Sequence, residues 1–275
     1  MRVLRKRPDG FHDIQTVLQT IDLRDRLSIS PTQDGEIQVR CDHPDVPSGP
    51  ENLAYGAARL LQREFQVRRG CRIKIVKKIP PAAGLGGGSS NAAAALVGLN
   101  KLWELNLSKG NLFALATRLG SDVPFFLEGG TALAEGRGHR LTPLQLIPDF
   151  WLVLIKPDLS IASRWAYQRI KIPLTSNSLY VKLNRLREIS NLEQLLGFLD
   201  NDLERAVEEV YPAIGEVKGE LLSKGAMGAT MSGSGSAVFG LVKTQKAAER
   251  LAMKVGRAKW QIFVVRPVRR CEGPG

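Results

Sequence analysis

The feature that most constrains this chain is a run of small residues between a strand-like and a helix-like segment. Residues 80–91 read Pro-Pro-Ala-Ala-Gly-Leu-Gly-Gly-Gly-Ser-Ser-Asn, and four alanines follow them. Glycine lets a backbone approach a ligand closely. The first turn of a helix leaves N–H groups unpaired at the positive end of the helix dipole. The run therefore predicts a phosphate site at the start of the following helix.

The run matches neither of two common phosphate-binding motifs. A P-loop needs Gly-Lys-Ser/Thr after the glycines, and a dinucleotide fingerprint needs a third glycine where Ser89 stands. The simpler alternative is a tight turn that binds nothing. However, adjacent glycines cost backbone entropy that a purely structural turn seldom needs, so phosphate binding is favoured.

Length and composition are those of a globular protein. The 275 residues are 43% hydrophobic and 24% charged, enough for one large domain or two ordinary ones. No apolar run reaches the roughly 18 residues of a membrane helix, and Met1–Pro8 lacks the apolar core of a secretory signal. Cys41, Cys71 and Cys271 are far apart and lack metal-ligand spacing, so a cytoplasmic location is predicted.

The net charge of +12 is strongly basic. This charge suits nucleic acid, or a polyanionic small substrate together with a nucleotide, and it also aids solubility by itself. The basic residues are scattered, with no single basic helix and no basic strand with interleaved aromatic residues. A nucleic-acid-binding protein is the alternative from another class, and salt-dependent RNA binding without ATP turnover would favour it.

Hydrophobic periodicity predicts an α+β fold with two lobes, residues 1–147 and 148–275. In the first lobe, alternation predicts strands within 14–30, with a bend at Asp22–Asp25, and a half-buried strand at Cys71–Ile75. The predicted helices start near Ser48–Glu51, follow the glycine run to Trp103, and extend from Ser108 to Gly120, with strand and loop in 131–150. In the second lobe, the predictions are a strand at 150–155, helices within 192–224, a strand–turn–strand at 228–242, a helix at 244–256 and a strand at 261–266.

Two other segments carry candidate functional residues. Leu119–Phe126 places Asp122 between a helix-stopping glycine and an apolar segment that begins with a proline, and Met231–Ser236 is a second glycine–serine loop. Each has a structural alternative: a turn carboxylate bonded to its own backbone, or a flexible hairpin turn. Their functional interpretation depends on their occurring together with the glycine run.

These segments, in this order and spacing, resemble the motifs of the GHMP kinases, the family named after galactokinase, homoserine kinase, mevalonate kinase and phosphomevalonate kinase. The matching segments are Pro80–Ala95, Gly120–Phe126 and Met231–Ser236, with further matches at Lys6–His12, Glu51–Leu53 and Asn201–Glu204. The likeness extends over nearly the whole chain. It implies a ribosomal-protein-like N-terminal lobe and a ferredoxin-like C-terminal lobe.

The further matches resemble the branch of the family that uses ATP and Mg²⁺ to phosphorylate a hydroxyl of a cytidine-diphosphate-linked methylerythritol in isoprenoid precursor synthesis. Phosphoryl transfer needs a phosphate cradle, a cation and a carboxylate near the accepting hydroxyl, which agrees with the residues found. Another GHMP kinase, acting on homoserine, mevalonate or a sugar, is the alternative within the same class. The resemblance implies a small-molecule substrate without nucleic acid or membrane, and a monomer or weak homodimer.

The resemblance also implies roles for individual residues. Asp122 matches the catalytic aspartate, which contacts the substrate and takes the proton from its hydroxyl, and Ser89 or Ser90 would lie near Mg²⁺. Phe11 and Tyr167 would stack on the cytosine and His12 would hydrogen-bond to it; the family usually has tyrosine at the Phe11 position, and stacking survives that change. The other implied substrate positions are Ser232, Gly233 and Ser234. The implied nucleotide positions are Asn52, Lys77, Pro80, Pro81, Ala82, Ala83, Gly84, Leu85, Gly86, Gly87, Gly88, Ser89 and Ser90.

One family segment is missing from the printed chain. In the family, a Pro-Ala-Lys-hydrophobic-Asn segment precedes the stretch that matches Lys6–His12, and its lysine lies against the catalytic aspartate. Lys6 is not that lysine, because it belongs to the later match. Either the natural product starts upstream of Met1, or the chain is a naturally shortened, weak or inactive homologue. The other matches favour the first explanation, because losing a cation near developing charge raises the barrier.

Overall fold

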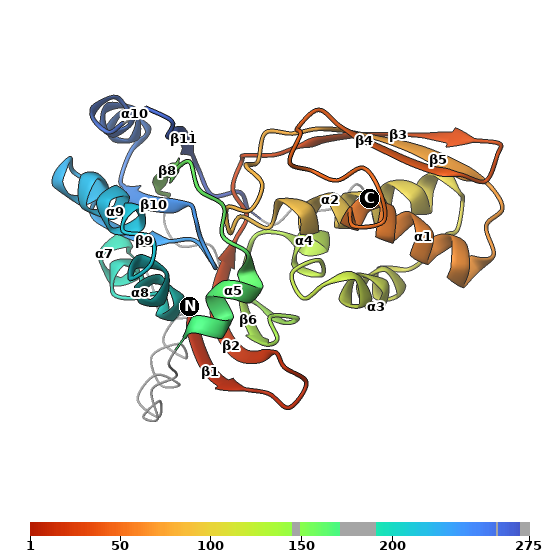
Figure 1. Cartoon of the computed structure of the whole chain (residues 1–275), viewed down its shortest axis with the longest axis horizontal. Coiled ribbons are helices and arrows are strands. Elements are labelled where there is room, and N and C mark those ends of the chain that lie inside the picture. The colour runs from red at the N-terminus through yellow and green to blue at the C-terminus, as the bar shows by residue number, and fades with distance from the viewer. Residues whose placement is uncertain (145–148, 171–190, 257, 270–275) are drawn as a thin grey trace. The chain divides into compact units, whose positions relative to one another are not determined.

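The computed structural model describes residues 1–144, 149–170, 191–256 and 258–269 (Figure 1). The chain forms two compact units. Unit 1 comprises Met1–Asp22, Ala82–Leu85 and Gly130–Gly275, and unit 2 comprises Leu23–Pro81 and Gly86–Gly129. The boundary expected between residues 147 and 148 lies at residues outside the described part of the chain, and it stays a prediction. None of the helices in the described part combines the length and apolar character needed to cross a bilayer.

Unit 2 contains a three-stranded sheet of order β3-β5-β4. Strand β5 runs antiparallel to β3 and parallel to β4. In β5, Cys71, Ile73 and Ile75 are fully buried while Arg72 and Lys74 are exposed, which confirms the predicted half-buried strand. The strands are β3 (Arg26–Thr32), β4 (Ile37–Cys41) and β5 (Gly70–Val76).

The helices of unit 2 are α1 (Leu53–Phe65), α2 (Gly87–Leu102), α3 (Lys109–Leu119) and α4 (Phe125–Glu128). Helices α1 and α2 lie beside each other along the sheet (Figure 1). Each helix buries three alanines, and small buried side chains of this kind are compatible with close helix packing. Ser108 and Asn111 form a capping box at the start of α3, and Gly120 follows its end, as predicted. The predicted start of α1 near Ser48–Glu51 is wrong, because the side chain of Asn52 caps the helix by accepting from the Ala54 N–H.

The described residues of unit 1 form two four-stranded sheets. The first has the order β1-β2-β6-β7 and is antiparallel throughout. The sequence pattern predicted β2 and the later strands but not β1, which is short and basic. The break between β2 and β3 agrees with the predicted bend. The strands are β1 (Arg2–Lys6), β2 (His12–Gln19), β6 (Thr131–Gly136) and β7 (Arg140–Leu144).

The second sheet of unit 1 has the order β11-β8-β10-β9, with antiparallel neighbours. This order, with helices between β8 and β9 and between β10 and β11, is the split βαβ arrangement of ferredoxin-like folds, as expected. Its strands are β8 (Trp151–Lys156), β9 (Gly228–Met231), β10 (Val238–Val242) and β11 (Gln261–Val265). The described helices are α5 (Ser163–Arg169), α7 (Leu192–Leu196), α8 (Asp202–Glu208), α9 (Ala213–Ser223) and α10 (Gln245–Lys254).

Candidate active site

The glycine run leads from β5 into the first turn of α2, and two of its glycines are required by the backbone. Gly84 and Gly86 have φ angles of 70° and 65°, which disfavour other residues. A Cβ atom at Gly84 would lie 2.1 Å from the Ser232 carbonyl oxygen, and one at Gly86 would lie 2.6 Å from the Phe126 ring. At Gly88, by contrast, a Cβ would meet only Leu53, at 3.7 Å. Packing therefore does not explain why position 88 lacks a side chain, whereas the predicted close approach of a ligand would.

The first turn of α2 also lacks a side-chain cap. Its N-cap, Gly86, makes no side-chain capping hydrogen bond, whereas α1 and α3 are capped by Asn52 and Ser108. The Ser90 hydroxyl donates to the Gly87 carbonyl at 2.8 Å. An uncapped helix start offers its N–H groups to an anion. The turn is therefore suited to a phosphate.

Lys77 lies beside this turn in a buried ion pair. Its ammonium is 2.5 Å from the Asp25 carboxylate, and the two side chains are 4% and 2% exposed. The carboxylate also accepts from the backbone N–H groups of Lys78 and Ile79 at 2.7 and 2.9 Å. A Cβ at Gly87 would lie 2.9 Å from the Lys77 ammonium. A cation next to a helix N-terminus is unfavourable by itself, and the Asp25 carboxylate compensates the Lys77 charge.

The sequence pattern named Lys77 and missed Asp25. Only the position of Asp25, the last residue of the predicted bend at 22–25, could have drawn attention to it. Asn52, the other predicted nucleotide residue outside the run, is buried, and both polar atoms of its side chain are hydrogen-bonded within the protein. Its amide nitrogen donates to the Pro47 carbonyl at 2.7 Å, and its oxygen caps α1. A contact between Asn52 and a nucleotide stays a prediction.

Asp122 lies in the turn between α3 and α4. The Val123 N–H donates to the Gly120 carbonyl at 3.3 Å and closes this turn. Among the residues that the structure describes, no hydrogen bond or ion pair holds the Asp122 carboxylate, so the alternative of a self-bonded turn carboxylate finds no support. The side chain is exposed to solvent, and desolvation by the surrounding protein raises the pKa of its carboxyl group. A raised pKa makes the carboxylate a stronger base.

The second glycine–serine loop holds residues 82–85 of the run, and both belong to unit 1. The Ser232 hydroxyl donates to the Gly84 carbonyl at 2.9 Å, and the Ala237 N–H donates to the Ala83 carbonyl at 3.1 Å. The Ser234 hydroxyl is hydrogen-bonded to that of Ser163 at 2.8 Å. The loop is thus tied to the run rather than being a free hairpin turn.

The three residues predicted for cytosine also belong to unit 1 and lie in two groups. The rings of His12 and Tyr167 stack with centroids 5.3 Å apart. The exposed ring of Phe11 carries the Arg137 guanidinium 3.7 Å above its centroid. Desolvation, and then Lys6, lowers the pKa of His12, so its imidazole is neutral at pH 7. The sequence pattern missed Arg137, which has no distinguishing neighbours in the chain.

The predicted site residues are thus divided between the units. Unit 2 holds Asn52, Lys77, Pro80, Pro81, Gly86, Gly87, Gly88, Ser89, Ser90 and Asp122, and unit 1 holds Phe11, His12, Ala82, Ala83, Gly84, Leu85, Tyr167, Ser232, Gly233 and Ser234. In the described ranges, no group of three or more histidine, cysteine or acidic side chains could hold a metal ion.

Comparisons with known proteins agree with this architecture. Residues 52–130 match the GHMP kinases N terminal domain, and residues 179–262 match the GHMP kinases C terminal domain. The 4-diphosphocytidyl-2-C-methyl-D-erythritol kinase of Geobacter sulfurreducens is 43% identical over 97% of this chain and 94% of its own. That of Pelotomaculum thermopropionicum is 43% identical over 96% of this chain and 92% of its own.

Solved structures show the same relationship. A crystal structure of 4-(cytidine 5'-diphospho)-2C-methyl-D-erythritol kinase matches with a TM-score of 0.75 and 33% identity, covering 97% of this chain and 94% of the other. A homoserine kinase from Cytophaga hutchinsonii matches with a TM-score of 0.74 over 94% of this chain and 90% of its own, but at 18% identity it shows the fold alone. Both domain models and near full-length relatives agree, so the chain belongs to the GHMP kinase family.

Proposed function

We propose that this chain is an ATP-dependent kinase that phosphorylates the 2-hydroxyl of 4-diphosphocytidyl-2-C-methyl-D-erythritol, in isoprenoid precursor synthesis that does not use mevalonate. The observation that carries the proposal is the 43% identity to kinases of that name over 97% of the chain. Homoserine and mevalonate kinases share the fold at 14–18% identity, and nothing in the site favours their substrates.

The first turn of α2 would bind the ATP phosphates. Its N–H groups point along the helix axis toward an anion, and Lys77 adds a positive charge beside Gly87. Mg²⁺, when bound, would neutralise charge on the phosphates; Ser89, in the first turn of α2, is the side chain that we propose to hold it. Because the glycines have no side chains, the phosphates can reach the backbone without a steric clash.

Asp122 would act as the general base toward the substrate hydroxyl. Its exposed carboxylate has no protein partner among the described residues, and its raised pKa favours accepting a proton. The cytosine would bind at Phe11, His12 and Tyr167. The neutral His12 imidazole has one donor and one acceptor for the base, and Arg137 has to leave the face of the Phe11 ring on which a base would stack.

A coupled assay of ADP release with the diphosphocytidyl substrate tests the proposal. We expect turnover with this substrate and none with homoserine or mevalonate, together with saturable binding of CDP and CMP. Binding of neither nucleotide would contradict the substrate assignment. A cytoplasmic location and a monomeric or weakly dimeric state stay predictions.

A further inference from the structure

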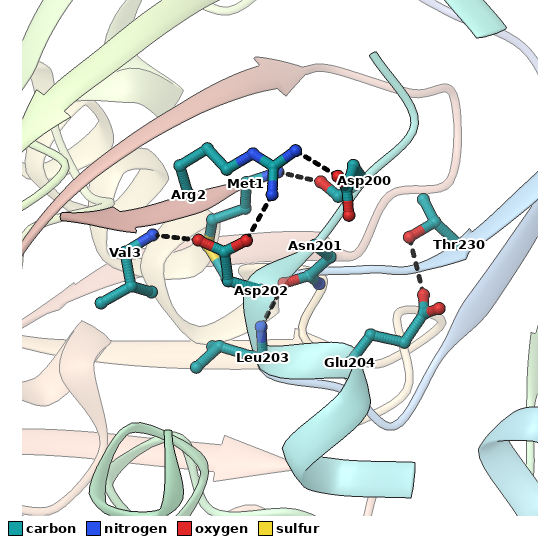
Figure 2. A network of polar contacts seen from close by, with 9 residues as sticks. All are labelled: Met1, Arg2, Val3, Asp200, Asn201, Asp202, Leu203, Glu204 and Thr230. Carbon is teal, nitrogen blue, oxygen red and sulfur yellow. Dashed lines mark hydrogen bonds and ion pairs between the residues drawn. The ribbon is translucent and has the colours of Figure 1, made fainter. Parts of the chain in front are cut away.

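Asn201–Glu204, at the start of α8, is a sequence motif to which the kinase chemistry above assigns no task. The side chains of this turn face two different parts of unit 1 (Figure 2). Asp202 faces β1, where its carboxylate accepts from Arg2 and from the Val3 N–H at 2.8 Å. Glu204 faces Thr230 in β9. The turn therefore connects β1 with the end of β9.

Two side chains of the turn hold both backbone polar groups of Met231. The Glu204 carboxylate accepts from the Met231 N–H at 2.7 Å, and the Asn201 amide donates to the Met231 carbonyl at 2.9 Å. The same amide donates to the Gly233 carbonyl at 2.8 Å. Strand β9 lies at the edge of its sheet, and an edge strand has backbone groups that no neighbouring strand pairs. Asn201 and Glu204 take the place of a neighbouring strand.

Glu204 is buried, with 8% of the residue exposed, and several groups donate hydrogen bonds to its carboxylate. Its carboxylate also accepts from the Thr230 hydroxyl at 2.7 Å and pairs with the Lys218 ammonium. A buried charge of this kind adds little stability compared with well-packed apolar residues. Its hydrogen bonds instead fix one backbone conformation at the end of β9.

That strand end continues into the loop that holds the glycine run. Ser232 follows Met231 directly and donates to the Gly84 carbonyl at 2.9 Å. A Cβ at Gly233 would lie only 3.1 Å from the same carbonyl oxygen, so the two backbones touch. A shift of Met231 would therefore be transmitted to Gly84, two residues before the N-cap of α2.

We propose that Asn201 and Glu204 are positioning residues for ATP: they hold residues 231–233, and this loop holds Ala83 and Gly84 in the conformation that receives the phosphates. The proposal rests on the proposed function, because the glycine run must bind ATP for its position to matter. Neither side chain touches the nucleotide. Their effect passes through the backbone of the loop.

Asn201→Ser tests the amide. Serine keeps the N-cap of α8 but cannot reach the Met231 and Gly233 carbonyls. We expect the affinity for a non-hydrolysable ATP analogue to fall about tenfold, while the affinity for CMP stays unchanged, by isothermal titration calorimetry. Asn191→Ser is the matched control, because Asn191 caps α7 through Gln194 and should leave both affinities unchanged. Equal losses for both ligands, or no loss for either, would overturn the proposal.

Glu204→Leu and Glu204→Gln test the carboxylate. Glutamine keeps the shape and one acceptor for the Met231 N–H, whereas leucine keeps neither. By hydrogen–deuterium exchange, we expect faster exchange of peptides covering residues 228–237 in Glu204→Leu and recovery in Glu204→Gln, with the ATP-analogue affinity following the same order. Restored protection without restored affinity would contradict the link between the loop and ATP.

Measurements on the wild-type protein distinguish failure of the proposed function from failure of the positioning role of Asn201 and Glu204. If it binds no ATP analogue, the proposed function fails and these variants say nothing of phosphates. If the wild type binds the analogue and Ser232→Ala weakens binding, Asn201→Ser should add little to that loss, because both act through one loop. Fully additive losses would assign Asn201 a role independent of Ser232 and would contradict the proposal.

Discussion

At the residue scale, the chemistry of the candidate site depends on groups that lack their usual partners. Asp122 has an exposed carboxylate with no ion pair among the described residues, and its pKa is raised by desolvation. Gly88 has no side chain although the structure leaves room for one. Features that reduce stability without a packing reason are expected at functional sites.

Replacing Asp122 with asparagine should separate activity from stability. Loss of a general base lowers kcat by about 10²–10⁴-fold, which the coupled assay measures. The folded-state pKa is raised, so the native protein binds the Asp122 proton more tightly than the unfolded chain does, and this contribution to stability is lost as pH rises. We therefore expect Asp122→Asn to melt at a higher temperature than the wild type at pH 8.

The difference in melting temperature should disappear at pH values below the unfolded pKa of about 4, where the wild-type carboxyl group is protonated in both states. A difference that stays constant with pH would show that it does not come from the ionisation of Asp122. Unchanged turnover in the variant would remove Asp122 from the role of general base. Differential scanning fluorimetry at a series of pH values measures the difference in melting temperature.

At the scale of single elements, the N-terminus of α2 combines a structural and a functional demand on glycine. Gly86 is required by its φ angle and by the Phe126 ring. Gly88 is not required by either. Gly86→Ala should therefore destabilise unit 2, whereas Gly88→Ala should stabilise the helix by about 0.5–1 kcal/mol.

The binding of an ATP analogue distinguishes the roles of these glycines. We expect Gly88→Ala to lose affinity in spite of its greater stability, because its methyl group occupies the space of a phosphate. Urea unfolding and calorimetry on the same preparations measure both quantities. If Gly88→Ala bound the analogue as tightly as the wild type, the phosphates would not lie against this turn.

The buried pair of Asp25 and Lys77 joins β3 and β5 to the start of α2. Asp25→Asn leaves the Lys77 ammonium without its counter-charge, and breaking a buried pair in this way costs about 3–5 kcal/mol. Glu64→Gln is the matched control, because its pair with Arg118 is exposed and is worth about 1 kcal/mol or less. Equal losses in urea unfolding would show that burial of the Asp25 pair does not matter.

At the scale of the whole molecule, the net charge of +12 acts on ligands before they reach the site. An attraction of this kind weakens with salt, because the Debye length falls below about 10 Å above 0.1 M ionic strength. We expect the affinities for ATP and CDP to fall as salt rises, whereas the affinity for cytidine, which carries no phosphate, should stay constant. Equal salt dependence for CDP and cytidine would rule out this contribution.

The sequence by itself determined most of the elements and indicated the main candidate site. Alternating hydrophobic residues identified β5, capping residues identified α3, and the strand–glycine–helix order predicted a phosphate site, because each depends on neighbours in the chain. Local signals were weaker at the start of α1, where both Ser48 and Asn52 can act as an N-cap, and in β1, which is short and basic.

Only the tertiary structure decided which distant groups meet. Asp25 and Lys77 are 52 residues apart, and Glu204 and Met231 are 27 residues apart. Arg137 lies on Phe11 from a different strand pair. The free energy of such contacts comes from burial and geometry after the sheets have formed, and no local pattern of residues encodes it. The partners that hold the glycine run in place were therefore visible only in the folded chain.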